Sequence, residues 1–273
     1  SVKRSIGQGG LMIADGYLIV TAEHGEILIA PASPKGFTPT ARQQVVKMKE
    51  YLKRQTEIFS EKENKRIENL NVMIAGTGGL GTNQAQHLIR MGINKIYLYD
   101  NDKIEITNLN RQILYGKDDI GKYKVDAAQK HLDNYCLDTE IIAKREKIKQ
   151  DTEIPADVDI IFDALDNFES RFILEELAVK KNIPFIHGGI ESWYGQVVAI
   201  IPGETVRLQE VFSGAETKST DVANFSPAVS IIASLQIIEG LKVYLDREDC
   251  LKNKLLLIDL KSCEVDKIDI KID

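Results

Sequence analysis

Cysteine is scarce in this sequence, and its cysteines are not arranged in pairs. Cys136, Cys250 and Cys263 are the three cysteines in 273 residues, and no Cys-x-x-Cys spacing occurs. This pattern argues against a disulfide framework and against a zinc site built from four thiolates. We therefore expect three small buried side chains and no zinc.

An excess of positive charge and a long apolar run are also lacking. The net charge is −6, so we expect no broad nucleic-acid surface. No apolar run approaches the roughly 20 residues that span a bilayer, and the opening "SVKRSIGQGG" has no apolar signal core. With 43% hydrophobic residues the composition is that of a globular protein, and we expect it in the cytoplasm with neither membrane nor nucleic acid as partner.

Strand and helix patterns alternate from residue 61 to residue 273. Apolar runs predict strands at 71–76, 94–100, 138–144, 157–163, 184–188 and 194–201, and helical periodicity predicts helices at 80–91, 122–135, 168–181 and 227–245. This alternation predicts an α/β domain with a Rossmann-like, doubly wound and mostly parallel sheet. The last 20 residues predict an antiparallel extension, and the polar segment 202–225 predicts a long loop.

Residues 1–60 have a different pattern and predict a small appendage. Two β-rich runs, 17–22 and 26–30, flank His24 and Gly25 and predict a hairpin with Gly25 at its turn. Residues 37–59 then predict a helix, with Thr38 as its cap and Pro39 in its first turn.

The stretch "GTGGLG" lies between a predicted strand and a predicted helix. Gly76 allows a tight exit from the strand, Gly78 and Gly79 allow close approach of a phosphate, and Gly81 allows the helix and strand to pack. The start of the helix offers unpaired N–H groups to an anion. Asp100 follows Gly76 by 24 residues at the end of the next strand, where a carboxylate can bind ribose hydroxyls. NAD and ATP are served equally well by these residues.

The polar residues that follow favour ATP. Asn108, Arg111, Gln112 and Lys124 supply donors suited to phosphate oxygens, which an NAD enzyme does not need here. Asp166 follows the strand 157–163, at the sheet edge where ligands bind in such folds. One carboxylate together with phosphates is a plausible magnesium site.

Five motifs together resemble the ubiquitin-activating-type adenylyltransferase superfamily, which includes the ThiF, MoeB and HesA proteins. They are "YLKRQ" (51–55), "GTGGLG", "YDND…TNLNRQ", "GKYK" and "DALDNFESR", and the resemblance covers residues 51–245. It implies that the three glycines from Gly78 to Gly81 line a nucleotide pocket, that Asp100 holds the ribose and that Asp166 binds Mg²⁺. It also implies a homodimer in which Arg54 reaches the phosphates bound to the neighbouring subunit.

The resemblance implies a reaction as well. In this family a substrate carboxylate attacks the α-phosphorus of ATP and gives an acyl adenylate and pyrophosphate. Asn108, Arg111, Gln112 and Lys124 match the family positions that contact the phosphates. Because a carboxylate is already ionised at neutral pH, no general base is required.

The chain departs from the family in its cysteines. Sulfur-carrier activators often hold zinc with two Cys-x-x-Cys pairs, and many have a cysteine nucleophile in the loop that corresponds to 202–225, which here has none. The departure favours a small-molecule carboxylate as acceptor, such as the guanylylpyridinol used by a ThiF-like enzyme of methanogens. The C-terminal glycine of a ubiquitin-like sulfur carrier is the alternative. A NAD-dependent oxidoreductase and an inactive dimeric scaffold stay open as further alternatives.

Three residues near these motifs carry less specific signals. Arg171 either orients Asp166 or pairs on a helix surface. Trp193 either packs beneath an acceptor channel or is an ordinary rim aromatic. His187, at a strand end, is the histidine with the strongest claim to inspection, since His87 and His131 fall on predicted helices.

Overall fold

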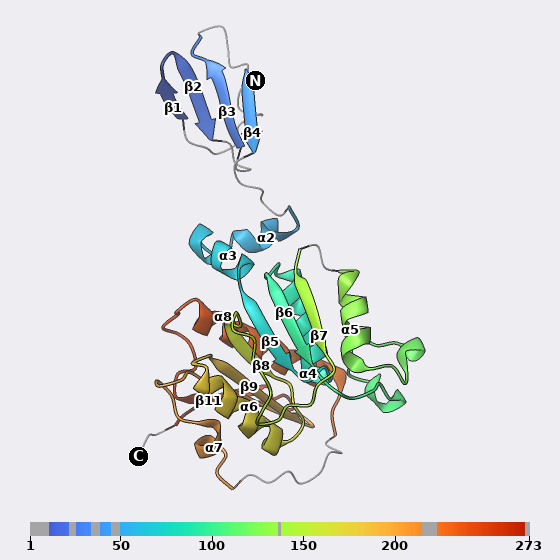
Figure 1. Ribbon diagram of the computed structural model, residues 1–273. Helices are drawn as coiled ribbons and strands as arrows, with labels where there is room; N and C mark the ends of the chain where they lie inside the picture. The colour runs from blue at the N-terminus through green and yellow to red at the C-terminus, as the bar shows by residue number, and fades with distance from the viewer. Residues whose placement is uncertain are drawn as a thin grey trace. The chain divides into compact units, whose positions relative to one another are not determined.

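The computed structural model describes residues 11–21, 26–33, 39–44, 50–135, 138–214 and 223–270 (Figure 1). It divides into two compact units, Ser1–Ser60 and Glu61–Asp273. Predictions for His24, Gly25, Thr38 and Cys136 lie outside the described residues.

The first unit is an antiparallel sheet followed by short helices. Its strands are β1 (Leu11–Ala14), β2 (Tyr17–Thr21), β3 (Glu26–Pro31) and β4 (Ala41–Gln44), paired in that order. The predicted pairing of the runs 17–22 and 26–30 is confirmed, with Val20 opposite Leu28. The predicted helix over 37–59 is wrong at its start, where Ala41–Gln44 pairs with β3. Among the described residues that follow, helical structure is found in η1 (Glu50–Leu52) and α2 (Lys53–Thr56).

The second unit has an eight-stranded sheet in the order β12-β11-β10-β9-β8-β5-β6-β7. The strands are β5 (Asn71–Ala75), β6 (Lys95–Tyr99), β7 (Glu140–Lys144), β8 (Ile160–Asp163), β9 (Phe185–Glu191), β10 (Tyr194–Ile200), β11 (Lys254–Asp259) and β12 (Glu264–Asp269). Strands β7, β6, β5, β8 and β9 run parallel to one another. Strands β10, β11 and β12 continue the sheet from β9, each antiparallel to its neighbour. The predicted Rossmann-like sheet with an antiparallel C-terminal extension is confirmed.

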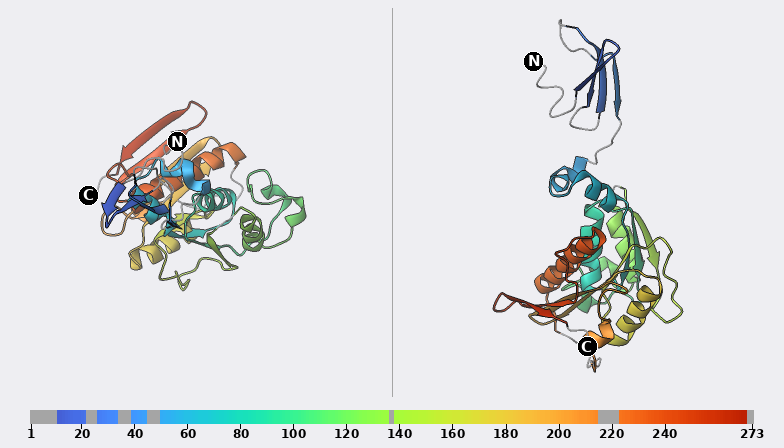
Figure 2. Two further views of the ribbon diagram at one scale, coloured as in Figure 1. Left: turned by 90° about the horizontal axis from the view of Figure 1, so that it is seen from above. Right: turned by 90° about the vertical axis from the view of Figure 1, so that its left-hand side faces the viewer.

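Helices cover both faces of this sheet, which is why its central strands read as continuous apolar runs. The helices that the structure describes in this unit are α3 (Glu61–Glu68), α4 (Gly79–Arg90), α5 (Lys124–Asp133), α6 (Phe168–Lys180), α7 (Leu208–Val211) and α8 (Ser226–Tyr244). Figure 2 shows α8 and α6 on opposite sides of the strands. Leu174 and Ala178 of α6 pack with Met73 and Phe185 in one buried cluster. On the other face, α8 packs against α4, β9 and β10.

One expectation needs correction. Cys263 is exposed and Cys250 is only half-buried, because both lie in the C-terminal segment rather than in the core. Among the described residues, α8 passes the length and composition test for a membrane span, with a mean hydropathy of 1.2 and 56% of its most apolar window buried. Gln236, Glu239 and Lys242 interrupt the apolar residues of this helix, and a helix packed on several sides in a core is apolar for that reason.

Candidate functional site

A pocket of about 720 Å³ lies where the connections of the parallel strands diverge. The chain leaves β5 toward β6 and β7 on one side and later returns to β8 and β9 on the other. Loops after the carboxyl ends of β5 and β8 therefore separate, and open α/β sheets bind ligands at this point. Nearly all of the predicted nucleotide residues of this unit line the pocket: Gly76, Gly78, Gly79, Asp100, Asn108, Arg111, Gln112, Lys124 and Asp166.

The glycine turn after β5 has two kinds of glycine. Gly76 has a φ of +95°, and a Cβ there would collide with the backbone carbonyl of Ala164. Gly81 does not line the pocket, and a Cβ on it would collide with the carbonyl of Gly76. These two glycines let the turn fold tightly against the β8 loop. By contrast, a Cβ on Gly78 would meet only the side chain of Gln112, at 3.6 Å.

Gly78 occupies the N-cap position of α4 and has no side chain with which to cap it. The first N–H groups of a helix lack partners within the helix, so this end of α4 offers donors and a partial positive charge to an anion. The phosphate-binding geometry expected from the sequence is therefore available at the pocket.

Asp100 ties the glycine turn to the end of β6. Its Oδ2 accepts from the backbone N–H of Thr77 at 2.7 Å and from the Thr77 hydroxyl at 3.0 Å. Its Oδ1 accepts from the N–H of Asp102 at 2.8 Å. A carboxylate offers about four acceptor positions, so Asp100 retains capacity for a ribose hydroxyl.

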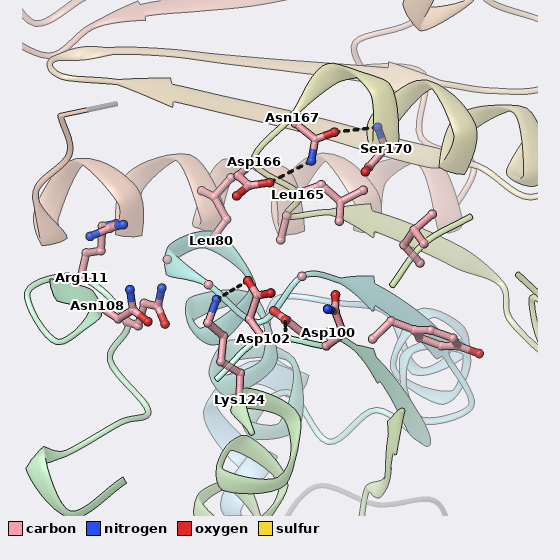
Figure 3. Close-up of a pocket in the computed structure, with 18 of the residues that line it drawn as sticks. Leu80, Asp100, Asp102, Asn108, Arg111, Lys124, Leu165, Asp166, Asn167 and Ser170 are labelled. Carbon is pink, nitrogen blue, oxygen red and sulfur yellow. Dashed lines mark hydrogen bonds and ion pairs between the residues drawn. The ribbon is translucent and has the colours of Figure 1, made fainter. Parts of the chain in front are cut away.

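The two cations differ in their surroundings. Lys124 is buried at the first turn of α5, and its Nζ pairs with Asp102 Oδ2 at 3.0 Å. Arg111 donates from Nη1 to the Asn110 side chain at 2.8 Å and to the Thr107 carbonyl at 3.0 Å. The described residues offer Arg111 no acidic partner within ion-pair distance, so its charge is available to an anion in the pocket (Figure 3).

The amides beside Arg111 have different partners. Asn108 Oδ1 accepts from the N–H of Glu105 at 3.0 Å and so stabilises the turn η2 (Ile106–Asn108). Gln112 is 4% exposed, and its Oε1 is buried with no hydrogen-bond partner in the part of the chain described. A buried amide oxygen without a donor is costly, so the Gln112 amide is suited to a ligand in the pocket.

Asp166 stands on the loop between β8 and α6, on the side of the pocket opposite Lys124 (Figure 3). It is exposed, and its Oδ1 accepts from Asn167 Nδ2 at 3.0 Å. Asn167 in turn caps α6 by accepting from the N–H of Ser170 at 2.8 Å. The described residues contain no group of three or more His, Cys, Asp or Glu able to hold a metal by themselves. One carboxylate facing a pocket with anion-binding groups fits Mg²⁺, which usually keeps several waters and is held by one or two carboxylates together with phosphate oxygens.

Three predicted residues are not among those that line this pocket. Arg54 is on α2, in the other compact unit. His187 is fully buried and bonds through Nδ1 to Asp163 at 2.6 Å, so it is not a pocket base. Trp193 packs against Phe225 in a tilted arrangement, with ring centroids 4.6 Å apart and an angle of 58° between the rings.

Sequence reasoning missed the buried residues behind the pocket. Tyr115 is buried, and its hydroxyl lies 2.7 Å from the carbonyl of Thr77 and 3.2 Å from that of Lys124. It thereby joins the glycine turn to the helix that bears the buried lysine. Burial raises the pKa of this phenol, so it stays protonated as a donor. Tyr115 lies within the "NLNRQILYG" stretch, yet nothing in its spacing indicated this contact.

Residues 52–272 match the model of the ThiF family. The sulfur carrier protein ThiS adenylyltransferase of Bacillus subtilis is 34% identical over 194 residues, which are 68% of this chain and 57% of that protein. The sulfur carrier protein adenylyltransferase of Thermus thermophilus is 29% identical over 218 residues, 76% of this chain and 80% of its own. This chain thus spans little more than half the length of the Bacillus relative.

Two solved structures share the fold. The crystal structure of E. coli MccB with ATP has a TM-score of 0.69 at 23% identity, and the match covers 77% of this chain and 66% of the MccB chain. The crystal structure of PaaA has a TM-score of 0.70 at 20% identity and covers 97% of this chain and 99% of its own.

Proposed function

Because this chain belongs to the ThiF family, we propose that it uses Mg-ATP to adenylylate a substrate carboxylate. The observation that carries the proposal is the meeting of a bare helix N-terminus, Arg111, Lys124 and Asp166 around one pocket. These groups come from four different segments of the chain. Their charges suit a triphosphate better than the two phosphates of NAD.

In the proposed reaction a carboxylate oxygen bonds to the α-phosphorus of ATP, and the bond from that phosphorus to pyrophosphate breaks. The products are an acyl adenylate and pyrophosphate. Catalysis then depends on alignment and on neutralising phosphate charge. Arg111 is suited to bind phosphate oxygens with its planar fork, while the helix N-terminus donates backbone N–H groups.

Asp166 is the residue proposed to hold Mg²⁺, which would supply positive charge to the phosphates. Asp102 pairs with the buried Lys124 ammonium at 3.0 Å and so offsets the cost of burying that group before nucleotide binds. When phosphate oxygens arrive, the ammonium has a second anionic partner within the same pocket. Asp102 therefore serves the proposed reaction as the resting counter-ion of Lys124.

Arg54 enters the proposal through a second subunit. It belongs to the unit Ser1–Ser60 and matches the family arginine that crosses a homodimer. We propose that two copies of this chain exchange Arg54 side chains between their phosphate pockets. Mixing an Arg54→Ala chain with an Asp166→Asn chain tests this, because one of the two sites in the hybrid dimer would then be intact and activity would return.

The acceptor has two candidates. The names of the Bacillus and Thermus relatives specify sulfur carrier proteins, which favours the C-terminal carboxylate of a small carrier. The lack of a cysteine in the loop 202–225 favours a small-molecule carboxylate, such as guanylylpyridinol. We place the carrier first, because the relatives with that substrate in their names reach 34% identity.

The test is incubation with ATP, Mg²⁺ and a panel of carboxylates, followed by mass spectrometry for an added AMP. The panel contains a Gly-Gly-ended carrier, a carrier lacking its last glycine, and pyridinol carboxylates. Asp166→Asn and Arg111→Ala are each expected to slow ATP–pyrophosphate exchange on the order of 10²–10³-fold. Arg145→Ala is the matched control, because Arg145 pairs with Asp126 outside the pocket. Normal exchange in both pocket variants would refute the assignment.

A further inference from the structure

We propose that Asp163, Arg171 and His187 form a positioning cluster that aims the Asp166 carboxylate into the pocket. The inference rests on the proposed function, because it assigns the cluster to the orientation of a magnesium ligand. We assign none of the three residues a direct contact with substrate or metal. They act through the peptide that joins Leu165 to Asp166.

The cluster holds the Leu165 peptide groups from both sides. The Leu165 N–H donates to Asp163 Oδ1 at 3.0 Å. The Leu165 carbonyl accepts from Arg171 Nη2 at 2.6 Å and from Arg171 Nε at 3.1 Å. Since that carbonyl belongs to the bond leading to Asp166, the guanidinium fixes the direction in which the chain enters Asp166.

Asp163 pairs with the Arg171 guanidinium, and His187 in turn bonds to Asp163. Asp163 Oδ2 lies 3.4 Å from Arg171 Nε and 2.6 Å from His187 Nδ1. The side chains of Asp163 and His187 are fully buried, and that of Arg171 is 11% exposed. A buried carboxylate requires paired donors, and here the two donors come from α6 and β9. Asp163 Oδ2 therefore links β8 to α6 through Arg171 and to β9 through His187.

The protons of this cluster have a single consistent arrangement. Burial, reinforced by the nearby positive charge of Arg171, lowers the pKa of His187, so its ring is neutral. Nδ1–H then donates to Asp163, and Nε2 accepts from Gln196 Nε2 at 3.2 Å. This tautomer leaves one negative charge on Asp163 opposite one positive charge on Arg171, so the buried cluster is electrically balanced.

A second arginine–carboxylate pair on the same helix provides a matched control. Glu175 of α6 is fully buried and pairs with Arg207, whose Nη2 lies 2.8 Å from Glu175 Oε2. Arg207 does not line the pocket, and its side chain bonds Glu175 rather than the Leu165 peptide. Disturbing this pair is expected to loosen the packing of α7 on α6 without removing a hydrogen bond from Leu165. The two pairs therefore separate a loss of stability from a loss of orientation.

The experiment compares Arg171→Lys with Arg207→Lys in the full-length protein. Lysine keeps the positive charge but cannot bond the Leu165 carbonyl through two nitrogens. Affinity for Mn²⁺ is measured by electron paramagnetic resonance on the protein saturated with a non-hydrolysable ATP analogue, and melting temperature is measured in parallel. We expect Arg171→Lys to weaken Mn²⁺ binding by about 10- to 100-fold, as for other groups that orient metal ligands. Arg207→Lys is expected to lower the melting temperature and leave Mn²⁺ affinity unchanged.

A double-mutant cycle makes the test decisive. In an Asp166→Asn background, Arg171→Lys is expected to have no further effect on Mn²⁺ affinity, because the side chain that it orients no longer binds metal. Equal losses of Mn²⁺ affinity in the two lysine variants, or additive losses in the double mutant, would overturn the positioning role. An unchanged Mn²⁺ affinity in Asp166→Asn would instead overturn the proposed metal site.

If Arg171→Lys does not fold, His187 gives the same comparison. His187→Asn keeps an N–H donor near the Nδ1 position, whereas His187→Leu removes it. We expect normal Mn²⁺ affinity in the asparagine variant and a loss of about tenfold in the leucine variant. Equal affinities in the two variants would overturn the proposal.

Discussion

Two strand-to-helix turns meet at the pocket, and they are built in opposite ways. The turn from β5 to α4 presents backbone and has no side chain at its cap, while the turn from β8 to α6 presents Asp166 and is capped by Asn167. The first depends on the absence of Cβ atoms and the second on hydrogen-bonded side chains. Both lie at the same sheet edge, and they touch where Gly76 faces Ala164. Anion binding by backbone and cation binding by a carboxylate thus require different kinds of local order.

Gly76→Ala is expected to have the largest effect on stability. A methyl group there would require a φ near +95° and would strike the Ala164 carbonyl, so it would disturb both turns at once. We expect a loss of roughly 2–6 kcal/mol in the free energy of unfolding, from backbone strain together with overpacking. Urea denaturation measures it. A loss below about 1 kcal/mol would mean that the two turns do not depend on their contact.

The sequence predicted the glycine turn well because its requirements are local. Glycines between an apolar run and a helical pattern, and Asp100 at the next strand end, are all visible along the chain. The cluster at the other turn could not be predicted in this way. Asp163, Arg171 and His187 are brought together by the pairing of β8 with β9. From the sequence, orientation of Asp166 by Arg171 was one of two alternatives, and His187 was only a histidine to inspect.

The same distinction explains the wrong helix in the first unit. Residues 41–44 carry no strong strand signal, and their β structure depends on pairing with Ile29 and its neighbours in β3. Such non-local hydrogen bonds override helix propensity, which is a weak prior. The parallel strands were predictable because burial on both faces gave them unbroken apolar runs.

The pH dependence of stability tests whether His187, in the cluster at the turn from β8 to α6, is buried as a neutral ring. Burial lowers the pKa of His187 in the folded protein, so below about pH 6.5 the unfolded chain binds a proton that the folded chain does not. Stability contributed by the neutral ring is therefore lost as pH falls, by up to about 1.4 kcal/mol per pH unit. Urea midpoints between pH 7 and pH 5.5 are expected to fall less steeply in His187→Asn. Parallel curves for the two proteins would contradict the buried neutral ring.

Removing the cap of α6 is expected to have a smaller effect. Asn167→Ala deletes the acceptor for the Ser170 N–H and the donor to Asp166. We expect a loss of about 1 kcal/mol in the free energy of unfolding. Asn167→Ser keeps a capping oxygen and serves as the control in the same denaturation experiment. Equal losses in the two variants would show that the cap is not the source.

Gly78→Ala is expected to have the smallest effect on stability, about 0.5 kcal/mol, because the methyl group would meet only Gln112 at 3.6 Å and the remaining cost is that of alanine in place of glycine at an N-cap. The methyl group would nevertheless stand between phosphate and the first N–H groups of α4. We expect calorimetry to give an ATP affinity weaker by about tenfold, or 1.4 kcal/mol. Unchanged affinity would show that phosphate does not approach this turn.

One amide in the middle of α8 has a consequence for motion. Gln236 is fully buried, donates to the carbonyls of Asp163 and Ile186, and accepts from Gln84 on α4. Sliding α8 by one helical turn, about 5.4 Å, would leave all of these polar groups without hydrogen-bond partners in an apolar interior. The helix consequently has a single register against the sheet. We therefore expect α4, α8, β8 and β9 to keep these positions relative to one another.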